Sequence, residues 1–222
     1  MRTLNFMLGC LIAVHAQPVP LPNLPDGFRI GASGPVVETF MDFLCPDCAG
    51  DWPVMGQLLA HYGSKISLIL HTFPLPYHTF AFRAAQGAHV IASLNASSSQ
   101  AVFDFATLMF TRQGEFYGAS LNQTWVDGHI ADLAATLGYS RASVLAGLAD
   151  DNLNEATRIS WKYSTSRYST GTPHCAFVAA AGICVALARS TAYCPSYHTL
   201  LRLSRSQTFT PTLTTPRPYQ TW

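Results

Sequence analysis

The chain carries little charge, and the charge that it has is unevenly placed. Only 11% of its 222 residues are charged, and the formal net charge is +1. Proteins that bind nucleic acid or anionic membranes electrostatically carry a basic excess, so the composition supports neither partner. All twelve acidic residues lie between Asp26 and Glu155, and residues 156–222 contain none. With 49% apolar residues, the chain is still typical of a globular protein with one sizeable core.

The N-terminus lacks an apolar run of bilayer length. Leu4 to Val14 is apolar but too short to cross a membrane, so no membrane span is predicted. Arg2 precedes this run, and small residues at positions 14 and 16 precede Gln17. This order predicts a signal peptide over residues 1–16 and a mature protein in the secretory pathway, either in the endoplasmic reticulum lumen or outside the cell.

Two sequons agree with secretion. Asn95-Ala96-Ser97 and Asn122-Gln123-Thr124 both fall in predicted loops, which makes Asn95 and Asn122 the predicted glycosylation sites. Signal cleavage would also remove Cys10 and leave five cysteines, an odd number that implies one free thiol or an intermolecular bond. The sequence leaves open the pairing of three of them, Cys175, Cys184 and Cys194. Cys175 is either a small core residue or a third redox thiol.

The most informative stretch joins a strand pattern to a pair of cysteines. Residues 36–44 are apolar at most positions, as expected for a strand buried on both faces of a sheet. Cys45-Pro46-Asp47-Cys48 follows, and a helical pattern begins immediately, which places Cys45 at a helix N-terminus. The unpaired N–H groups and the helix dipole favour a thiolate there and lower its pKa below about 8.5. The charge of Asp47 is expected to raise that pKa and make the pair a weaker oxidant.

A Cys-x-x-Cys pair can serve redox chemistry or form half of a zinc site. The other cysteines, with His174 and His198 nearby, match no standard ligand spacing, so we predict a redox pair and no metal. The remaining histidines are scattered over separate predicted elements and are interpreted as surface or core groups. They are His61, His71, His78, His89 and His129.

The rest of the chain predicts an α/β framework with helices inserted into it. Residues 17–35, with five prolines, predict an extended lead-in arm that lacks a helix or a central strand. The helix after the motif, with Pro53 near its start, ends at Gly63, and residues 65–70 form a second strand parallel to the first. Residues 79–168 show helical periodicity throughout. The last stretch, residues 203–222, is rich in Ser, Thr and Pro and predicts a disordered tail.

Four apolar stripes in residues 79–168 predict helices that face a core. The third helix has Thr124 as its expected N-cap, Asp127 in its first turn and Gly138 just past its end. The fourth is expected to run unbroken from Ser140 towards Ile159. None of the stripes suggests a cofactor-binding motif.

These residues resemble the DsbA-like branch of the thioredoxin fold, in its eukaryotic secretory thioredoxin-like form. The resemblance rests on residues 40–48, the turn at residues 73–78, the helical block, and residues 163–167 leading into Thr172-Pro173. It implies an α/β thioredoxin-like domain over residues 36–202 with an inserted all-helical subdomain at about 79–168. It also implies that Thr172-Pro173 is a cis X-Pro pair that lies beside the motif and shapes a substrate groove.

The chain differs from the family pattern at three points. Close relatives often have Cys-Pro-Asp-Ser at the motif. Many members place a buried acid six residues before the first cysteine, where this chain has Thr39, and strand alternation puts Glu38 and Asp42 on the opposite face. After Thr172-Pro173 the family continues with two strands and a closing helix. The acid-free C-terminus is either a divergent end or an altered reading frame, and the second would remove the last strand and the helix.

The leading interpretation is thiol–disulfide exchange on protein thiols or disulfides, without a cofactor. Cys45 would be the exposed nucleophile and Cys48 the resolving thiol, with Pro46 and Asp47 setting the loop between them. Thr172 and Pro173 would pair with an extended substrate backbone. The alternative is a binding module in which Cys45–Cys48 is a structural disulfide and the helical block is the binding surface. A transferase of the glutathione type would need a cofactor groove that the sequence does not reveal, and the oligomeric state is unspecified.

Overall fold

The computed structural model describes residues 26–31, 34–118, 120–167, 172, 174–179 and 182–187, the last two ranges by their backbone alone. A five-stranded sheet runs through these residues in the order β1-β3-β2-β4-β5. Its strands are β1 (Phe28–Ile30), β2 (Val36–Met41), β3 (Ser67–Thr72), β4 (His174–Ala179) and β5 (Gly182–Leu187). The predicted signal peptide, most of the lead-in arm, Pro173, Cys194 and the predicted tail lie outside the described residues.

Strand β2 is the central strand, as the apolar run before the motif predicts. It pairs with β3 in parallel and with β4 in antiparallel orientation. Five of its six residues are buried, because neighbours cover both of its faces. The parallel β2–α1–β3 unit is also confirmed, with α1 spanning Pro46–Tyr62 and ending at Gly63, which has a φ of 53°.

Strand β1 lies at one end of the sheet and pairs antiparallel with β3. The sequence pattern does not predict it, because three residues after a proline-rich stretch are too few to show alternation. Strand β5 pairs antiparallel with β4 at the other end. One strand therefore follows residue 181, and the choice between a divergent end and an altered reading frame stays open.

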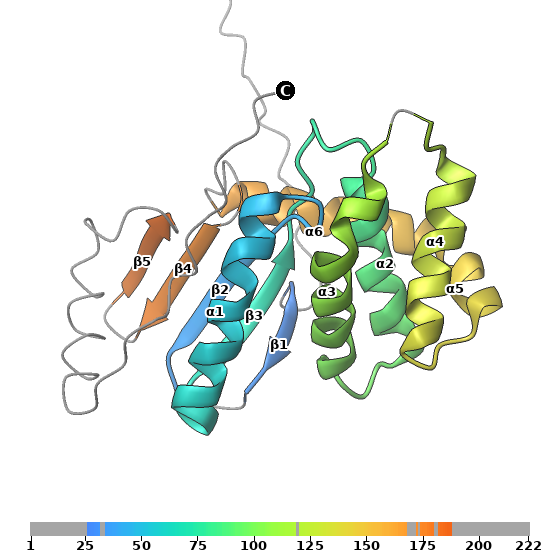
Figure 1. Cartoon of the computed structure of the whole chain (residues 1–222). Coiled ribbons are helices and arrows are strands. Elements are labelled where there is room, and N and C mark those ends of the chain that lie inside the picture. Colours follow the sequence, from blue (N-terminus) through green and yellow to red (C-terminus); the bar gives the residue numbers. More distant parts are fainter. Residues whose placement is uncertain are drawn as a thin grey trace, which may run out of the picture.

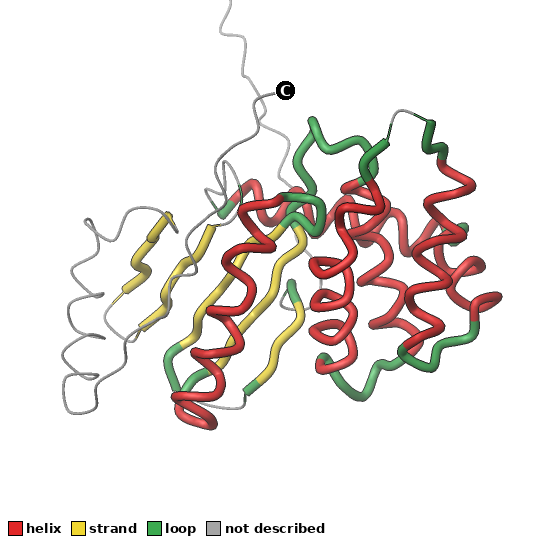
Figure 2. Tube along the Cα trace, viewed as in Figure 1, coloured by secondary structure: helices red, strands yellow, loops and turns green. Residues whose placement is uncertain are grey.

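The helical insertion forms a block beside the sheet. Figure 1 shows α1 in front of the strands and α2 to α5 gathered to one side, with α6 running behind. Figure 2 shows the same division, with the strands together on one side of the molecule and most helices on the other. The block consists of α2 (Ala81–Leu94), α3 (Gln100–Arg112), the short 3₁₀ helix η2 (Gln113–Phe116), α4 (Gln123–Thr136), α5 (Arg141–Leu148) and α6 (Asp151–Ser166).

Three local predictions about helices are wrong. The N-cap of α4 is Asn122, whose side chain accepts a hydrogen bond from the Trp125 N–H, so Thr124 and Asp127 lie further inside the helix than expected. The stripe from Ser140 to Ile159 is split into α5 and α6, because Asp150 caps a new helix by accepting from the Asn152 N–H at 2.7 Å. Pro53 lies inside α1, not near its start, because the helix already begins at Pro46.

Helices α2 and α5 approach closely at a glycine, which gives a testable prediction. A Cβ atom on Gly147 would lie 2.6 Å from Cγ1 of Val90, a fully buried and β-branched side chain that has no room to move. We expect Gly147→Ala to lower the free energy of unfolding by about 1–2 kcal/mol despite the better helix propensity of alanine. Chemical denaturation measures the change.

The matched control is Gly56→Ala in α1, where a Cβ atom would meet no atom within 4 Å. That variant is expected to gain about 0.5–1 kcal/mol from helix propensity alone. Equal gains for both variants would show that α5 does not pack on α2 in this way.

Candidate active site

Cys45 and Cys48 lie where β2 leads into α1. Cys45 is the N-cap residue of α1, and its carbonyl accepts the first helical hydrogen bond, from the Ala49 N–H at 3.1 Å. Pro46 is the first residue of the helix, a position where its missing N–H leaves no bond unmade. Both cysteines are free thiols and both are buried, Cys45 with 5% of its surface exposed and Cys48 with none. The expectation of an exposed Cys45 is therefore wrong, since only an edge of this residue reaches solvent.

The two thiols differ sharply in acidity. Hydrogen bonds lower the pKa of Cys45 to about 6 against the opposing effect of burial. The largest contribution comes from the Cys48 side chain, and smaller ones come from the backbone N–H groups of Cys48 and Asp47 and from the Thr172 side chain. The Asp47 backbone N–H thus favours the thiolate, while the opposing effect expected of the Asp47 carboxylate stays a prediction. Burial raises the pKa of Cys48 strongly, and the hydrogen bond to Cys45 adds to the increase. Near neutral pH, Cys45 is the thiolate and Cys48 is the thiol.

Thr172 reaches the motif from the far end of the described chain. Its carbonyl oxygen accepts a hydrogen bond from the Cys45 thiol at 3.6 Å, across 127 residues of sequence. Its hydroxyl is buried, and a hydrogen bond from this side chain is one of the causes that lower the pKa of Cys45. The pairing of β2 with β4 brings it there, since Phe40 lies opposite His174 in the register. The structure therefore brings Thr172 together with Cys45, while Pro173 lies outside the described residues.

A buried carboxylate that the sequence analysis gave no role lies beside the motif. Asp42 follows the last residue of β2 and is 1% exposed. Its carboxylate accepts hydrogen bonds from the backbone N–H groups of Leu44 and Leu75, at 2.8 and 2.9 Å, and lies 2.7 Å from Nδ1 of His78. It therefore joins the loop that carries the motif to the loop between β3 and α2. Glu38, the other acid near Thr39, lies 3.0 Å from the Arg167 guanidinium of the loop after α6.

The histidines are less isolated than their spacing suggests. Three of them contact carboxylates at hydrogen-bonding distance: His71 with Asp26, His78 with Asp42, and His129 with Glu115. Burial lowers the pKa of His89 to about 4, so it is neutral near neutral pH. No group of three or more potential metal ligands occurs among the described residues.

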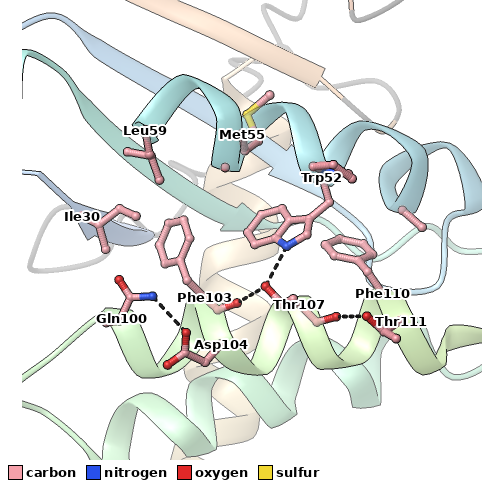
Figure 3. Close-up of a pocket in the computed structure, with 13 residues that line it drawn as sticks. Ile30, Trp52, Met55, Leu59, Gln100, Phe103, Asp104, Thr107, Phe110 and Thr111 are labelled. Carbon is pink, nitrogen blue, oxygen red and sulfur yellow. Dashed lines mark hydrogen bonds between the residues drawn. The ribbon is translucent and has the colours of Figure 1, made fainter. Parts of the chain in front are cut away.

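A cavity of about 520 Å³ lies between α1 and α3. Figure 3 shows that apolar side chains such as Trp52 and Phe103 form its walls and that the polar groups drawn there bond to one another. Trp52 Nε1 donates to the Thr107 hydroxyl at 2.9 Å, and Gln100 donates to Asp104 at the same distance. Neither cysteine lines this cavity, so it does not form part of the thiol site.

Comparison with known proteins agrees with this geometry. The family model described as Thioredoxin matches residues 26–165. No curated protein sequence matches the chain. Within the described residues, no helix is long and apolar enough to cross a membrane.

Solved structures share the fold at low sequence identity. A Pseudomonas syringae protein proposed to be a protein-disulfide isomerase is 16% identical, has a TM-score of 0.63, and aligns over 80% of this chain and 97% of its own. The thiol-disulfide exchange protein alpha-DsbA2 of Wolbachia pipientis is 17% identical, with a TM-score of 0.58 over 82% of this chain and 87% of its own. DsbA2 of Pseudomonas aeruginosa is 14% identical and has a TM-score of 0.59, and it aligns over 83% of this chain and 97% of its own. The predicted fold class, an α/β thioredoxin-like fold with a helical insertion, is confirmed.

Proposed function

The chain belongs to the thioredoxin family, and from that premise we propose that it is a thiol–disulfide oxidoreductase that acts on protein cysteines. The observation that carries the proposal is the opposite acidity of two adjacent thiols. Cys45 has its pKa lowered to about 6 at the N-terminus of α1, and Cys48 beside it keeps its proton. An activated thiolate paired with a second thiol is the arrangement that disulfide exchange requires.

The reaction needs only these two side chains and a substrate. The Cys45 thiolate attacks one sulfur of a substrate disulfide, and the other substrate sulfur leaves as a thiolate. Cys48 then gives up its proton to solvent and attacks the Cys45 sulfur, which releases the second substrate thiolate and forms the Cys45–Cys48 disulfide. Two electrons pass to the substrate. In the opposite direction, a substrate thiolate attacks Cys45 of the disulfide form and Cys48 leaves. A second substrate thiolate then attacks the substrate sulfur of the mixed disulfide, which releases the Cys45 thiolate and leaves the substrate as a disulfide. No cofactor takes part in either direction.

Thr172 is suited to hold the substrate backbone. When Cys45 loses its proton, the Thr172 carbonyl loses its donor and becomes free to accept a hydrogen bond from a substrate N–H. The Thr172 hydroxyl acts on the thiol itself, because its hydrogen bond helps to lower the pKa of Cys45. We propose that an extended substrate segment pairs here, with Pro173 contributing to the same groove.

The finer features of the site and its setting belong to the same proposal. Cys-Pro-Asp-Cys is the redox motif, with Pro46 and Asp47 in the first turn of α1 and not in a loop as predicted. The protein works in the secretory pathway after loss of residues 1–16. Disulfides form and persist in the oxidising environment of this pathway. Asn122 is exposed, and its Oδ1 caps α4 while its Nδ2 remains available for a glycan. Asn95, at the C-terminal end of α2, is the second proposed site.

One observation favours the alternative function. Only 5% of Cys45 is exposed, and a structural disulfide in a binding module would be buried in this way. A redox titration separates the two. On protein without residues 1–16, equilibrated in glutathione buffers, we expect a reversible couple between about −270 and −120 mV. A Cys45–Cys48 disulfide with a reduction potential below about −300 mV would contradict the oxidoreductase and support a structural disulfide.

The lowered pKa of Cys45 also predicts a pH dependence. In the reduced protein, carboxamidomethylation of Cys45 by iodoacetamide should reach half its maximal rate near pH 6. A thiol whose pKa is lower in the folded than in the unfolded protein stabilises the fold. This contribution is complete at a pH above the unfolded pKa of about 9, and it is lost as the pH falls through the folded pKa of about 6. The stability advantage of the reduced protein over Cys45→Ser should therefore grow between these pH values. A midpoint at or above that of free cysteine would contradict the activated nucleophile.

A further inference from the structure

The loop before the redox motif is held by side chains from the helical insertion. Nε2 of Gln113 donates to the carbonyl oxygens of Phe43 and Cys45, at 3.1 and 3.2 Å. The Tyr117 hydroxyl donates to the carbonyl oxygen of Leu44 between them. Three successive carbonyls at the entry to α1 are thus bonded by one short segment, which comprises η2 and the residue that follows it. The two sides of this contact are 68 to 73 residues apart in sequence.

These bonds do more than satisfy the backbone. The Cys45 carbonyl already accepts the first helical bond, from the Ala49 N–H, so Gln113 supplies a second donor to the N-cap residue. Gln113 thus fixes the orientation of the 43–44 and 45–46 peptide units, and Tyr117 fixes that of the 44–45 unit between them. Each donor also offsets the partial negative charge of a carbonyl oxygen in the segment that carries Cys45, and a nearby negative charge disfavours a thiolate.

Tyr117 is suited to stay a donor while Cys45 is ionised. Burial, together with the negative charges of Asp42 and Cys45, raises the pKa of Tyr117 to about 12. The other groups that share the field of Cys45 are Asp47 on α1 and Tyr77 on the loop after β3, whose pKa is also raised. Neither of the phenols loses its proton in the range where the Cys45 thiol does.

We propose that Gln113 and Tyr117 are positioning residues for the exchange reaction, which hold the carbonyls of residues 43–45 so that the Cys45 sulfur stays at the N-terminus of α1. The inference rests on the proposed function and deepens it, because it makes the helical insertion a working part of the redox site. The sequence gives no signal for this role, since neither residue has a fixed spacing to the motif.

The test is the pH profile of Cys45 alkylation in the reduced full-length protein. Gln113→Met keeps the side-chain length and removes both donors, and Tyr117→Phe removes only the hydroxyl. We expect the midpoint to rise by about one pH unit in Gln113→Met and by about half a unit in Tyr117→Phe. The reduction potential should become more negative in both, because the reduced form loses the stabilisation of its thiolate.

Gln100→Met is the matched control. Gln100 lies on the same insertion, but its side chain bonds Asp104 and not the motif loop, so the midpoint should stay at the wild-type value. Should Gln113→Met fail to fold, Tyr117→Phe still tests the inference, because it removes one oxygen from a side chain that is 48% exposed.

The outcomes separate this inference from the function on which it rests. A wild-type midpoint near 6, with variants that fold and stay within about 0.2 pH unit of it, overturns the positioning role and leaves the oxidoreductase intact. A wild-type midpoint at the value of free cysteine overturns both, since no activated thiolate would then exist for the two residues to maintain. A rise in the two variants and none in Gln100→Met supports the inference.

Discussion

Cys48→Ser is expected to make the protein accumulate a mixed disulfide with its substrate. Cys45 still attacks the substrate, but no second thiol is present to release the adduct, and the rate of complete exchange should fall by about 100-fold or more. Serine is close to cysteine in size, so the fully buried position should tolerate it. The adduct with a disulfide-containing peptide is measured by intact mass and by its loss on reduction. Because the bond from Cys48 lowers the Cys45 pKa, the reaction should be run at about pH 8.5, where an ordinary thiol also ionises.

Cys45→Ser is the control for this prediction and should form no adduct at all. An adduct through Cys48 in that variant would mean that the two roles are reversed. If Cys48→Ser also forms none, although its Cys45 reacts with iodoacetamide, the pair does not perform exchange. The structural-disulfide alternative would then be favoured.

Asp42→Asn is expected to lower the free energy of unfolding by about 3 kcal/mol. The carboxylate accepts at both oxygens, one from the Leu44 N–H and the other from the Leu75 N–H and His78. An amide has only one oxygen, so its NH₂ group must face a backbone N–H, and the position is too buried for water to compensate. His78 can change tautomer to accept, but the Leu75 N–H cannot. Chemical denaturation at neutral pH measures the loss.

Asp104→Asn is the matched control, since Asp104 is an exposed acid on α3 that pairs only with neighbouring polar groups such as Gln100. Its stability should change by no more than about 0.5 kcal/mol. Comparable small changes in both variants would show that the Asp42 carboxylate is not a buried link between the two loops.

Much of the framework can be predicted because its signals are local. The apolar run before Cys45 and the Cys-x-x-Cys motif lie within thirteen residues, and they predict β2, the start of α1 and the acidity of Cys45. Helical periodicity similarly predicts the insertion. It does not predict the break between α5 and α6, because the apolar spacing continues across it while the Asp150 cap interrupts the backbone.

The surroundings of the thiols could not be predicted in the same way. Asp42 meets Leu75 and His78 across 33 and 36 residues, and Gln113 meets Cys45 across 68. These are ordinary polar residues without a characteristic spacing, and they become partners only after the loops and the insertion have packed. The burial of Cys45 is a consequence of the same packing. Strand alternation also does not apply to Asp42, because β2 ends at Met41 and the Asp42 carboxylate bonds within the loop that follows.

The central position of β2 has a consequence for synthesis on the ribosome. Its partner β4 begins 133 residues after Met41 in the chain. One edge of β2 therefore stays unpaired until the ribosome has synthesised the whole insertion. At about 5–20 residues per second, that interval lasts roughly 7–27 s, and such distant pairings also form slowly. During this time the Cys45 sulfur lacks Thr172, and the nascent thiol is open to any disulfide nearby. In chains that emerge into an oxidising compartment, we therefore expect the Cys45–Cys48 disulfide to form before the sheet is complete. Newly synthesised protein should then carry this disulfide from the start.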